Sequence, residues 1–361
     1  MFKNYTELEQ IGKGAQGTVF RAIDNRLGRS VAIKSLNNNL TKSSIQEDRF
    51  VAEAKLLAQL NHPNIVTLYD YISDTNGHHL IMELIKGNSL DLIIKQQTGP
   101  INELRAINIF LNILDAIAYI HKKDILHRDI KPSNIMLDEF DQVKLLDFGI
   151  AKNNLNDIKI TKIGGSVGGT PMYMSPEHVG KEQIMKASDI YSLGVTLWHM
   201  VTGQEPYLNH TEAEITACIL RDPLKEPKEI YPHVSNRMND IIQRATKKEI
   251  NERFSSCFDF HNALLGLKEE LLNQQNKSDS RLSISNERIE CKIIVRLNNV
   301  SNASIIVNRT GHFGNELMEY FLPGTLVKIR IIKEGYQLYV KQFTVNENKT
   351  INVNLKKNRF F

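Results

Sequence analysis

Along residues 5–34, apolar and polar positions alternate and β-branched residues recur. Alternation with a period of two is typical of strands that bury one face. Three glycines interrupt the alternation: Gly12, Gly14 and Gly17. The pattern therefore predicts a β-hairpin that turns at these glycines, followed by a short apolar strand that ends at Lys34.

Further along the chain, apolar positions recur every three or four residues, which is the spacing of a helix with one buried face. This spacing predicts three helices, over residues 46–60, 89–96 and 101–122. Between and after them, a strand is expected over residues 79–87 and a hairpin over residues 137–146.

The pattern changes again after Leu272. Residues 273–288 are polar and contain no aromatic residue, so a flexible linker is expected there. From residue 289 to residue 361 the period of two returns in five runs, which Asn, Gly and Pro turns separate. Short alternating runs of this kind predict a small all-β sandwich.

Composition narrows the class of protein. A length of 361 residues fits two or three domains. The apolar fraction of 41% and the charged fraction of 24% lie in the globular range, which argues against a disordered or fibrous protein. The net charge is +4, and the first 270 residues show no basic stripe with interleaved aromatics, so no nucleic-acid partner is expected.

Basic residues concentrate in the C-terminal segment. Residues 289–361 contain eleven Lys and Arg and five Glu, an excess of six positive charges. Such an excess favours an anionic partner, such as an acidic protein, a polysaccharide or an envelope surface. Solvated strand faces are the commoner explanation of charge of this kind, and both interpretations stay open.

Three cysteines, Cys218, Cys257 and Cys291, lie far apart and form no CxxC pair. This usage favours a reducing compartment over a disulfide framework or a zinc site. The N-terminus has no apolar signal region, and no run approaches about 18 uninterrupted apolar residues, the length of a membrane span. A cytoplasmic protein without a transmembrane segment is expected.

Two short motifs carry candidate chemistry. Residues 127–134 read HRDIKPSN, and residues 147–149 read DFG. Phosphoryl transfer needs a base for the incoming hydroxyl, oxygen ligands for Mg²⁺ and positive charge. The two motifs offer all of these, in Asp129, Lys131, Asn134 and Asp147.

An HRDxKxxN motif followed at this distance by DFG resembles the catalytic and metal-binding loops of the protein kinases, and of the bacterial Hanks-type serine/threonine kinases in particular. The resemblance implies ATP and Mg²⁺ as cofactors. It implies that Asp129 accepts the proton of the substrate hydroxyl and that Lys131 neutralises charge on the transferred group. In the same scheme Asn134 and Asp147 hold Mg²⁺.

The resemblance extends from residue 5 to about residue 270 and implies the fold. The expected class is α+β, a bilobal kinase fold over residues 1–272 followed by the small β-sandwich. Its N-lobe, residues 1–85, would be rich in strands, and its C-lobe, residues 86–272, would be helical.

The glycine-rich hairpin reads GxGxxGxV. GxGxxG alone also fits a dinucleotide-binding loop, but that motif needs a helix directly after it, and residues 18–24 read as a strand. The kinase resemblance places Lys34 at the ATP phosphates, with Glu53 as its carboxylate partner. Glu47 is the competing carboxylate in the same predicted helix, but only Glu53 is followed four residues later by a leucine.

The resemblance also implies a set of nucleotide contacts in the lid, the adjoining strand and the hinge between the lobes. Met82 would stand at the entrance to the adenine site, and the backbone of Glu83 and Ile85 would bond the adenine edge. The whole set is Ile11, Gly12, Lys13, Gly14, Gly17, Val19, Ala32, Lys34, Met82, Glu83, Ile85 and Met136.

Residues 147–177 show little periodicity and are rich in Gly, Thr, Ser and Lys, so a mobile loop is expected. Kinases carry their activation segment at this place. Thr170, together with Lys131, matches the pattern of Ser/Thr-directed enzymes. Arg128 precedes the catalytic aspartate, and a phosphate on Thr161 or Ser166, with Thr161 favoured, is expected to bind it and order the loop. The alternative is that Arg128 only braces the loop through backbone carbonyls.

Two further resemblances concern structure. Arg253 stands where the family keeps an arginine that pairs with the glutamate of its APE motif, here Glu177 in SPE. The C-terminal run from Leu322 to Leu355 resembles the PEGA domain, a β module of bacterial envelope and regulatory proteins. Immunoglobulin-like and carboxypeptidase-regulatory-like sandwiches remain alternatives.

Two functions therefore compete. The first is a serine/threonine protein kinase that phosphorylates protein substrates and its own activation segment. The second is a pseudokinase scaffold whose β domain is the functional binding module. A pseudokinase is expected to lack at least one phosphotransfer group, and none is missing from this sequence.

Overall fold

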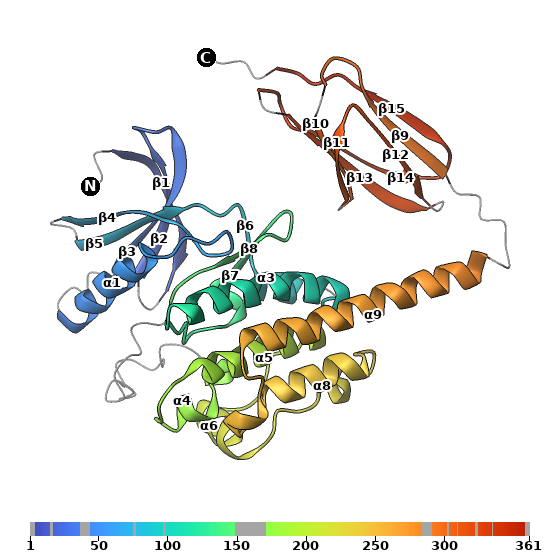
Figure 1. The fold of residues 1–361 in the computed structure, drawn as a ribbon. Helices are drawn as coiled ribbons and strands as arrows, with labels where there is room; N and C mark the ends of the chain where they lie inside the picture. The colour runs from blue at the N-terminus through green and yellow to red at the C-terminus, as the bar shows by residue number, and fades with distance from the viewer. Residues whose placement is uncertain are drawn as a thin grey trace. The chain divides into compact units, whose positions relative to one another are not determined.

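A computed structural model describes residues 4–14, 17–36, 44–74, 77–96, 99–148, 171–283, 291–301, 303–308, 310–321, 324–333 and 335–357. The chain divides into two compact units, residues 1–272 and 273–361. The first unit combines a sheet-rich N-lobe with a helical C-lobe, and the second is built from strands (Figure 1).

The N-lobe is an antiparallel five-stranded sheet with the order β1-β2-β3-β5-β4. Helix α1 packs against β4 and β5. The predicted glycine hairpin is present as β1 and β2. Tyr5, Gly17, Ala22 and Asp24 are its buried residues, and most of β1 is exposed. The bounds are β1 (Tyr5–Lys13), β2 (Gly17–Asp24), β3 (Arg29–Leu36), α1 (Ser44–Leu57), β4 (Leu68–Asp74) and β5 (Gly77–Glu83).

A small sheet with the strand order β6-β7-β8 belongs to the C-lobe and lies where the two lobes join. Its strands are β6 (Gly87–Ser89), β7 (Ile135–Asp138) and β8 (Val143–Leu145). A Cβ at Gly87 would lie 1.9 Å from the carbonyl oxygen of Leu137, so the approach of β6 to β7 requires glycine. The catalytic motif lies directly before β7, in the loop after α3 (Glu103–Lys122).

Helix α3 begins two residues later than predicted. The Asn102 side chain accepts hydrogen bonds from the backbone N–H groups of Leu104 and Arg105, which caps the helix there. Among the described residues, α3 is the one helix long and apolar enough to cross a membrane. Its buried apolar residues, from Ala106 to Ile120, form part of the hydrophobic core.

Helix α5, whose residues are almost all buried, contacts α3, α4, α7 and α8 in the C-lobe. Helix α5 approaches α8 at Gly194, where a Cβ would lie 2.7 Å from the Cβ of Ala245. The helices are α2 (Leu90–Gln96), α4 (Pro176–Val179), α5 (Lys186–Thr202), α6 (Glu212–Arg221), α7 (Pro227–Ile230), α8 (Asn236–Ala245) and α9 (Cys257–Ser283). The described part of the lobe also contains the 3₁₀ turns η1 (Pro132–Asn134), η3 (Pro171–Tyr173) and η4 (Ile250–Glu252).

Helix α9 extends beyond the boundary expected from composition. Its first turns join the C-lobe core, where the ring of Phe260 stacks on that of Phe254 at 4.7 Å. The helix continues to Ser283, so residues 273–283 are helical, whereas a flexible linker was predicted over 273–288. Gln, Lys and Arg in this stretch are good helix formers, and helix propagation from a packed segment is favourable.

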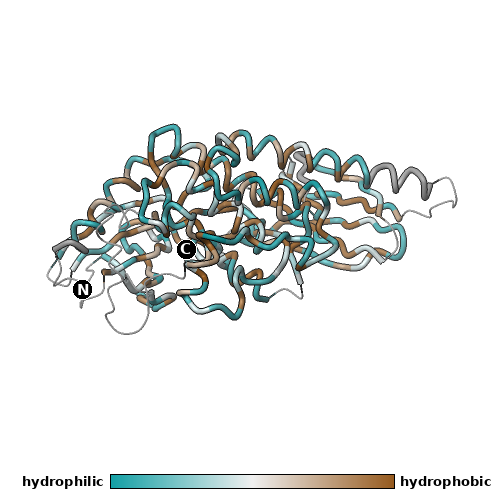
Figure 2. The backbone as a smooth tube through the Cα atoms, turned by 90° about the horizontal axis from the view of Figure 1, so that it is seen from below, coloured by the Kyte–Doolittle hydropathy of each residue, from teal (hydrophilic) through white to brown (hydrophobic). Residues whose placement is uncertain are grey.

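The second unit has two sheets, with the orders β11-β10-β13-β14 and β12-β9-β15. Alternate residues of the strands form one apolar core, and Figure 2 shows this alternation as changing brown and teal along the chain. Strand β15 runs parallel to β9, and the other pairings are antiparallel. The strands are β9 (Cys291–Leu297), β10 (Ala303–Val307), β11 (Thr310–Gly314), β12 (Glu316–Phe321), β13 (Thr325–Ile332), β14 (Tyr339–Val345) and β15 (Lys349–Val353).

The small all-β unit is therefore confirmed, but it has two strands more than the five predicted. The unpredicted strands are β11 and β12. Gly311 and Gly314 interrupt the alternation of β11, and glutamates stand at two positions of β12. Pairing with β10 and β9 overrides this weak local preference.

Candidate active site

The HRDIKPSN motif forms a loop between α3 and β7 that brings three predicted residues together. The Nζ of Lys131 lies 2.9 Å from Oδ2 of Asp129. The amide nitrogen of Asn134 donates to Oδ2 of Asp129 at 2.9 Å and to the Asp129 carbonyl at 2.8 Å. A cation and an amide therefore hold the same oxygen, Oδ2, of the Asp129 carboxylate.

The side chain of Asp189, in the first turn of α5, binds the backbone of this loop. Its Oδ2 accepts from the N–H of His127 and its Oδ1 from the N–H of Arg128, both at 2.9 Å. Arg128 has a φ of 64°, a conformation that costs free energy for a residue with a side chain. Burial would raise the pKa of Asp189, but the hydrogen bond from His121 and its other donors lower it below the ordinary value.

Lys34, on β3, connects the two lobes. Its Nζ lies 3.0 Å from Oε1 of Glu53 on α1 and 2.7 Å from Oδ1 of Asp147. Burial disfavours the ammonium, but the carboxylates of Asp147 and Glu53 outweigh it and raise the pKa of Lys34. Burial raises the pKa of Glu53, and Lys34 opposes that rise. We take the pair as charged at neutral pH, because the close N–O contacts stabilise both charges.

The competing carboxylate lies elsewhere. Oε1 of Glu47 is 3.9 Å from Nε2 of His78 on β5. The structure therefore brings Lys34 together with Glu53, whereas Glu47 lies beside His78. Asp147 has a φ of 43°, and the next side chain, Phe148, is buried with its ring 4.7 Å from that of His127.

The predicted nucleotide contacts gather on one face of the N-lobe sheet. Val19 lies opposite Lys34 in the β2–β3 register, and Ala32 lies opposite Met82 in the β3–β5 register. Residues directly opposite one another, and residues two apart on a strand, share a face. Val19, Ala32 and Met82 are therefore on the face from which Lys34 reaches Asp147.

The glycine lid lies at the end of this face. Ile11, Gly12 and Lys13 end β1, and Gly14 donates its N–H to the carbonyl of Gly17 at 2.8 Å. A Cβ at Gly17 would lie 2.4 Å from the carbonyl oxygen of Ser35, so glycine is required where β2 meets β3.

The hinge contains an ion pair that sequence reasoning missed. Oε2 of Glu83 lies 2.8 Å from Nζ of Lys144 on β8, and the N–H of Glu83 donates to the carbonyl of Thr67. Ile85 follows β5 and is half-buried, and Met136 lies opposite Lys144 in the β7–β8 register. In the sequence, the one hint at this pair is that Lys144 is a charged residue between the apolar residues Val143 and Leu145, shortly before the DFG motif.

The predicted Arg253–Glu177 pair lies in the C-lobe interior. The guanidinium of Arg253 donates to both carboxylate oxygens of Glu177, at 2.8 and 2.9 Å. It also donates to the carbonyls of Lys247, Lys248 and Ala187. Burial would raise the pKa of Glu177, but the hydrogen bonds from Arg253 and Ser188 lower it.

Several predicted residues lie outside the described part of the chain. These are Gly149, Thr161, Ser166 and Thr170.

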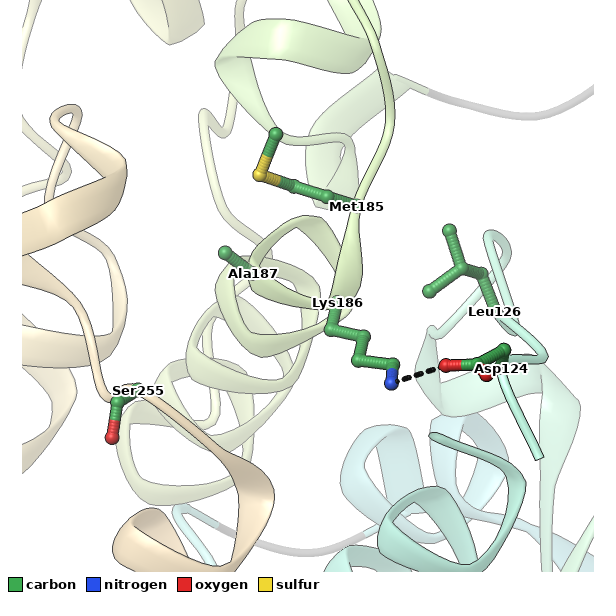
Figure 3. A pocket seen from close by; sticks show the side chains of 6 residues that line it. All are labelled: Asp124, Leu126, Met185, Lys186, Ala187 and Ser255. Atoms are coloured by element: carbon green, nitrogen blue, oxygen red, sulfur yellow. Dashed lines mark hydrogen bonds and ion pairs between the residues drawn. The ribbon is translucent and has the colours of Figure 1, made fainter. Parts of the chain in front are cut away.

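A surface hollow lies apart from these groups, at the N-terminus of α5 (Figure 3). Lys186 crosses it and bonds Oδ1 of Asp124 at 2.7 Å. The other lining residues are Leu126, Met185, Ala187 and Ser255. None of the predicted site residues lines this hollow.

The comparisons with known proteins agree on one family. A family model described as "Protein kinase domain" matches residues 5–265. The chain is 35% identical over 265 residues to the probable serine/threonine-protein kinase PknB of Bifidobacterium longum, with 71% of this chain and 38% of that protein covered. It is 36% identical over 255 residues to the serine/threonine-protein kinase PrkC of Bacillus subtilis, with 71% and 39% covered.

The chain thus spans about two fifths of the length of these curated relatives. The crystal structure of the PknI kinase domain of Mycobacterium tuberculosis superposes with a TM-score of 0.58 and 22% identity, covering 74% of this chain and 97% of that one. That likeness supports the bilobal fold, which is confirmed. Because the family model matches well over half of the sequence, the chain belongs to the protein kinase family.

Proposed function

We propose that this chain is a serine/threonine protein kinase that transfers the γ-phosphoryl group of ATP to hydroxyls of protein substrates. The observation that carries the proposal is the presence of two charged clusters, one within the catalytic loop and one that joins the two lobes. Asp129, Lys131 and Asn134 contact one another in one loop, and Asp147 contacts Lys34, which is paired with Glu53.

The donor set fits the magnesium ion that the family uses. Asn134 turns its amide nitrogen to Asp129, which leaves its amide oxygen for a ligand, and Asp147 offers a half-exposed carboxylate. Oxygen donors of this kind suit Mg²⁺. Asn134 and Asp147 would hold the ion, which neutralises charge on the phosphate oxygens when bound with ATP.

The residues of the chain then have distinct tasks. Asp129 would orient the acceptor hydroxyl and accept its proton, and Lys131, 2.9 Å away, would supply positive charge beside it. Lys34 would bind the phosphates, and Glu53 would keep Lys34 in place. The glycine lid would bring backbone N–H groups to the phosphates.

The direct test is autophosphorylation of the purified chain with ATP and Mg²⁺ beside Asp129→Asn. Incorporation by the wild type and its loss in the variant support the proposal. A folded wild-type protein that binds ATP but transfers no phosphate would instead support the pseudokinase alternative.

We further infer that phosphate on the activation segment controls the enzyme. Within the described residues, the Nε of Arg128 is buried without a hydrogen-bond partner, and Arg128 forms no ion pair. Burial lowers the pKa of Arg128, which a phosphate dianion nearby would offset.

The double variant Thr161→Ala/Ser166→Ala is therefore expected to bind ATP normally but to phosphorylate an added protein substrate far more slowly. Mass spectrometry of the active wild type should find phosphate at Thr161, Ser166 or both. Neither site modified, with the variant as fast as the wild type, would rule out this form of control.

The nucleotide site is expected to function without the second unit, because every predicted contact lies in residues 1–272. Removal of residues 284–361, which keeps the whole of α9, should leave the ATP- and Mg²⁺-dependent rise in melting temperature unchanged. Circular dichroism of the truncated chain verifies folding. A folded truncated chain that lacks the shift seen in the full chain would contradict the prediction.

For the second unit we propose a PEGA-like targeting module that binds an anionic partner. The support is its two-sheet architecture and the excess of six positive charges over residues 289–361. We also propose a cytoplasmic location, which the three free thiols favour.

A further inference from the structure

Three buried side chains from three helices form a continuous chain of contacts beneath the catalytic loop. Cys257 begins α9, His121 lies in the last turn of α3, and Asp189 lies in the first turn of α5. Sγ of Cys257 is 3.7 Å from Nδ1 of His121, and Nε2 of His121 is 2.8 Å from Oδ2 of Asp189. The exposed fractions of the three residues are 2%, 6% and 1%.

The Asp189 carboxylate and the Cys257 thiol agree on which ring nitrogen of His121 carries the proton. Burial raises the pKa of the Cys257 thiol, so the sulfur keeps its hydrogen and can donate it. A donating thiol requires an acceptor at Nδ1, and the carboxylate of Asp189 requires a donor at Nε2. The neutral ring protonated at Nε2 satisfies both neighbours, whereas the other tautomer satisfies neither.

Asp189 connects His121 to the catalytic loop. Its Oδ2 accepts from both His121 and the N–H of His127, and its Oδ1 accepts from the N–H of Arg128. Rotation of the carboxylate would release the left-handed Arg128, the residue directly before Asp129. The orientation of Asp189 therefore bears on the position of the proposed base.

We propose that the Cys257 thiol is a positioning group: by donating to Nδ1 of His121 it supports the tautomer that the Asp189 carboxylate requires, and so holds the ring against the carboxylate that fixes the catalytic loop. The kinetic part of this inference rests on the proposed phosphotransfer, and the tautomer part does not.

Packing alone would account for a buried cysteine, and the two roles differ in what a serine does. Serine keeps a hydrogen-bond donor but adds a polar group to an apolar core, whereas alanine removes the donor and keeps the site apolar. If Cys257 only fills space, activity should follow stability. If it positions His121, serine should preserve activity whatever it costs in stability.

The experiment compares the full chain with Cys257→Ala and Cys257→Ser, using dephosphorylated casein as acceptor. Cys257→Ala is expected to lower kcat by about threefold to tenfold, with the KM for ATP unchanged, while Cys257→Ser stays within about twofold of the wild type. Cys291→Ala is the matched control, because Cys291 is equally buried but lies in the second unit. Lys186→Ala removes the exposed ion pair between Lys186 and Asp124 (Figure 3). This pair also joins α5 to the segment before the catalytic loop.

Nitrogen-15 NMR of histidine-labelled protein reads the tautomer without any turnover. The signals of His121 among the eleven histidines are assigned by their loss in His121→Gln. The wild type and Cys257→Ser should show protonation at Nε2, and Cys257→Ala should show a smaller share of this tautomer.

Each outcome decides the matter. A wild-type ring protonated at Nδ1, an unchanged tautomer in Cys257→Ala, or equal kcat values for the alanine and serine variants would overturn the proposal. An inactive wild type would remove the proposed phosphotransfer, and the NMR result would still test the positioning.

Discussion

Asp147→Asn should abolish phosphoryl transfer while the protein stays folded. The substitution keeps the shape of the side chain and removes its charge, and the Asp147 side chain is 44% exposed, so it contributes little to the core. The loss removes a proposed Mg²⁺ ligand and one of the two carboxylates that contact Lys34. Loss of one preorganised electrostatic group costs roughly a hundredfold to a thousandfold in kcat, and a metal ligand lies at the upper end.

Lys34→Met should have the same kinetic effect for a different reason. Methionine fills the space of the buried lysine stem, and the Glu53 carboxyl left behind can become protonated, because burial already raises its pKa. Both variants should therefore retain the wild-type circular dichroism spectrum and lose phosphate incorporation from labelled ATP.

The matched control is Lys186→Met, which removes another lysine in close contact with a carboxylate, at 2.7 Å, but on the surface. It should transfer phosphate at the wild-type rate. If either site variant stays folded and incorporates phosphate like this control, the two clusters are not the phosphotransfer site.

Much of the fold could be predicted because local pattern and tertiary structure agree. Helices α1, α2 and α3 and most of the C-terminal strands follow the spacing of their apolar residues, and the hairpin turns at the glycines as predicted. The pattern failed where pairing partners decide the structure, as in β11 and β12. It also failed over residues 273–283, where polar helix formers extend an already packed helix.

For the site, the sequence predicted the residues that would contact ATP but not the residues that support them. Motif resemblance pointed to residues that would touch ATP, and the structure brings Lys34, Glu53 and Asp147 together. It gave no sign of Lys144 or Cys257, because each acts on a neighbour that only the fold supplies. A histidine six residues before His127 is visible in the sequence, but its contact with Asp189, 68 residues away, is not.

Arg253→Ala should destabilise the C-lobe more than any surface substitution. It removes five hydrogen bonds from a fully buried guanidinium and leaves the Glu177 carboxylate buried without its cation. Breaking one side of a buried ion pair costs about 3 to 5 kcal/mol. For a unit of this size that corresponds to a fall of about 10 °C in melting temperature.

The single tryptophan gives a local probe of this loss. Trp198 is buried in α5, so its fluorescence follows unfolding of the C-lobe and not of the second unit. Arg244→Ala is the matched control, because Arg244 is exposed and its guanidinium lies 4.4 Å from the Phe254 ring centroid. It should cost less than about 1 kcal/mol. Equal losses in the two variants would show that the buried pair adds no special stability.

The same pair predicts how stability depends on pH. The pKa of Glu177 is lowered in the folded protein, so its charge stabilises the fold above the unfolded pKa, and this contribution is lost as pH falls through the folded pKa. Glu177→Gln removes the charge at every pH. The difference in unfolding free energy between wild type and Glu177→Gln should therefore be largest near neutral pH and shrink in acid. In acid, protonation removes the Glu177 charge from the wild type, and the substitution has already removed it from the variant. Urea unfolding followed by Trp198 fluorescence at several pH values measures this difference, and other titrating groups cancel in the comparison. A difference that stays constant down to the acid limit of folding would mean that the Glu177 charge is not what Arg253 stabilises.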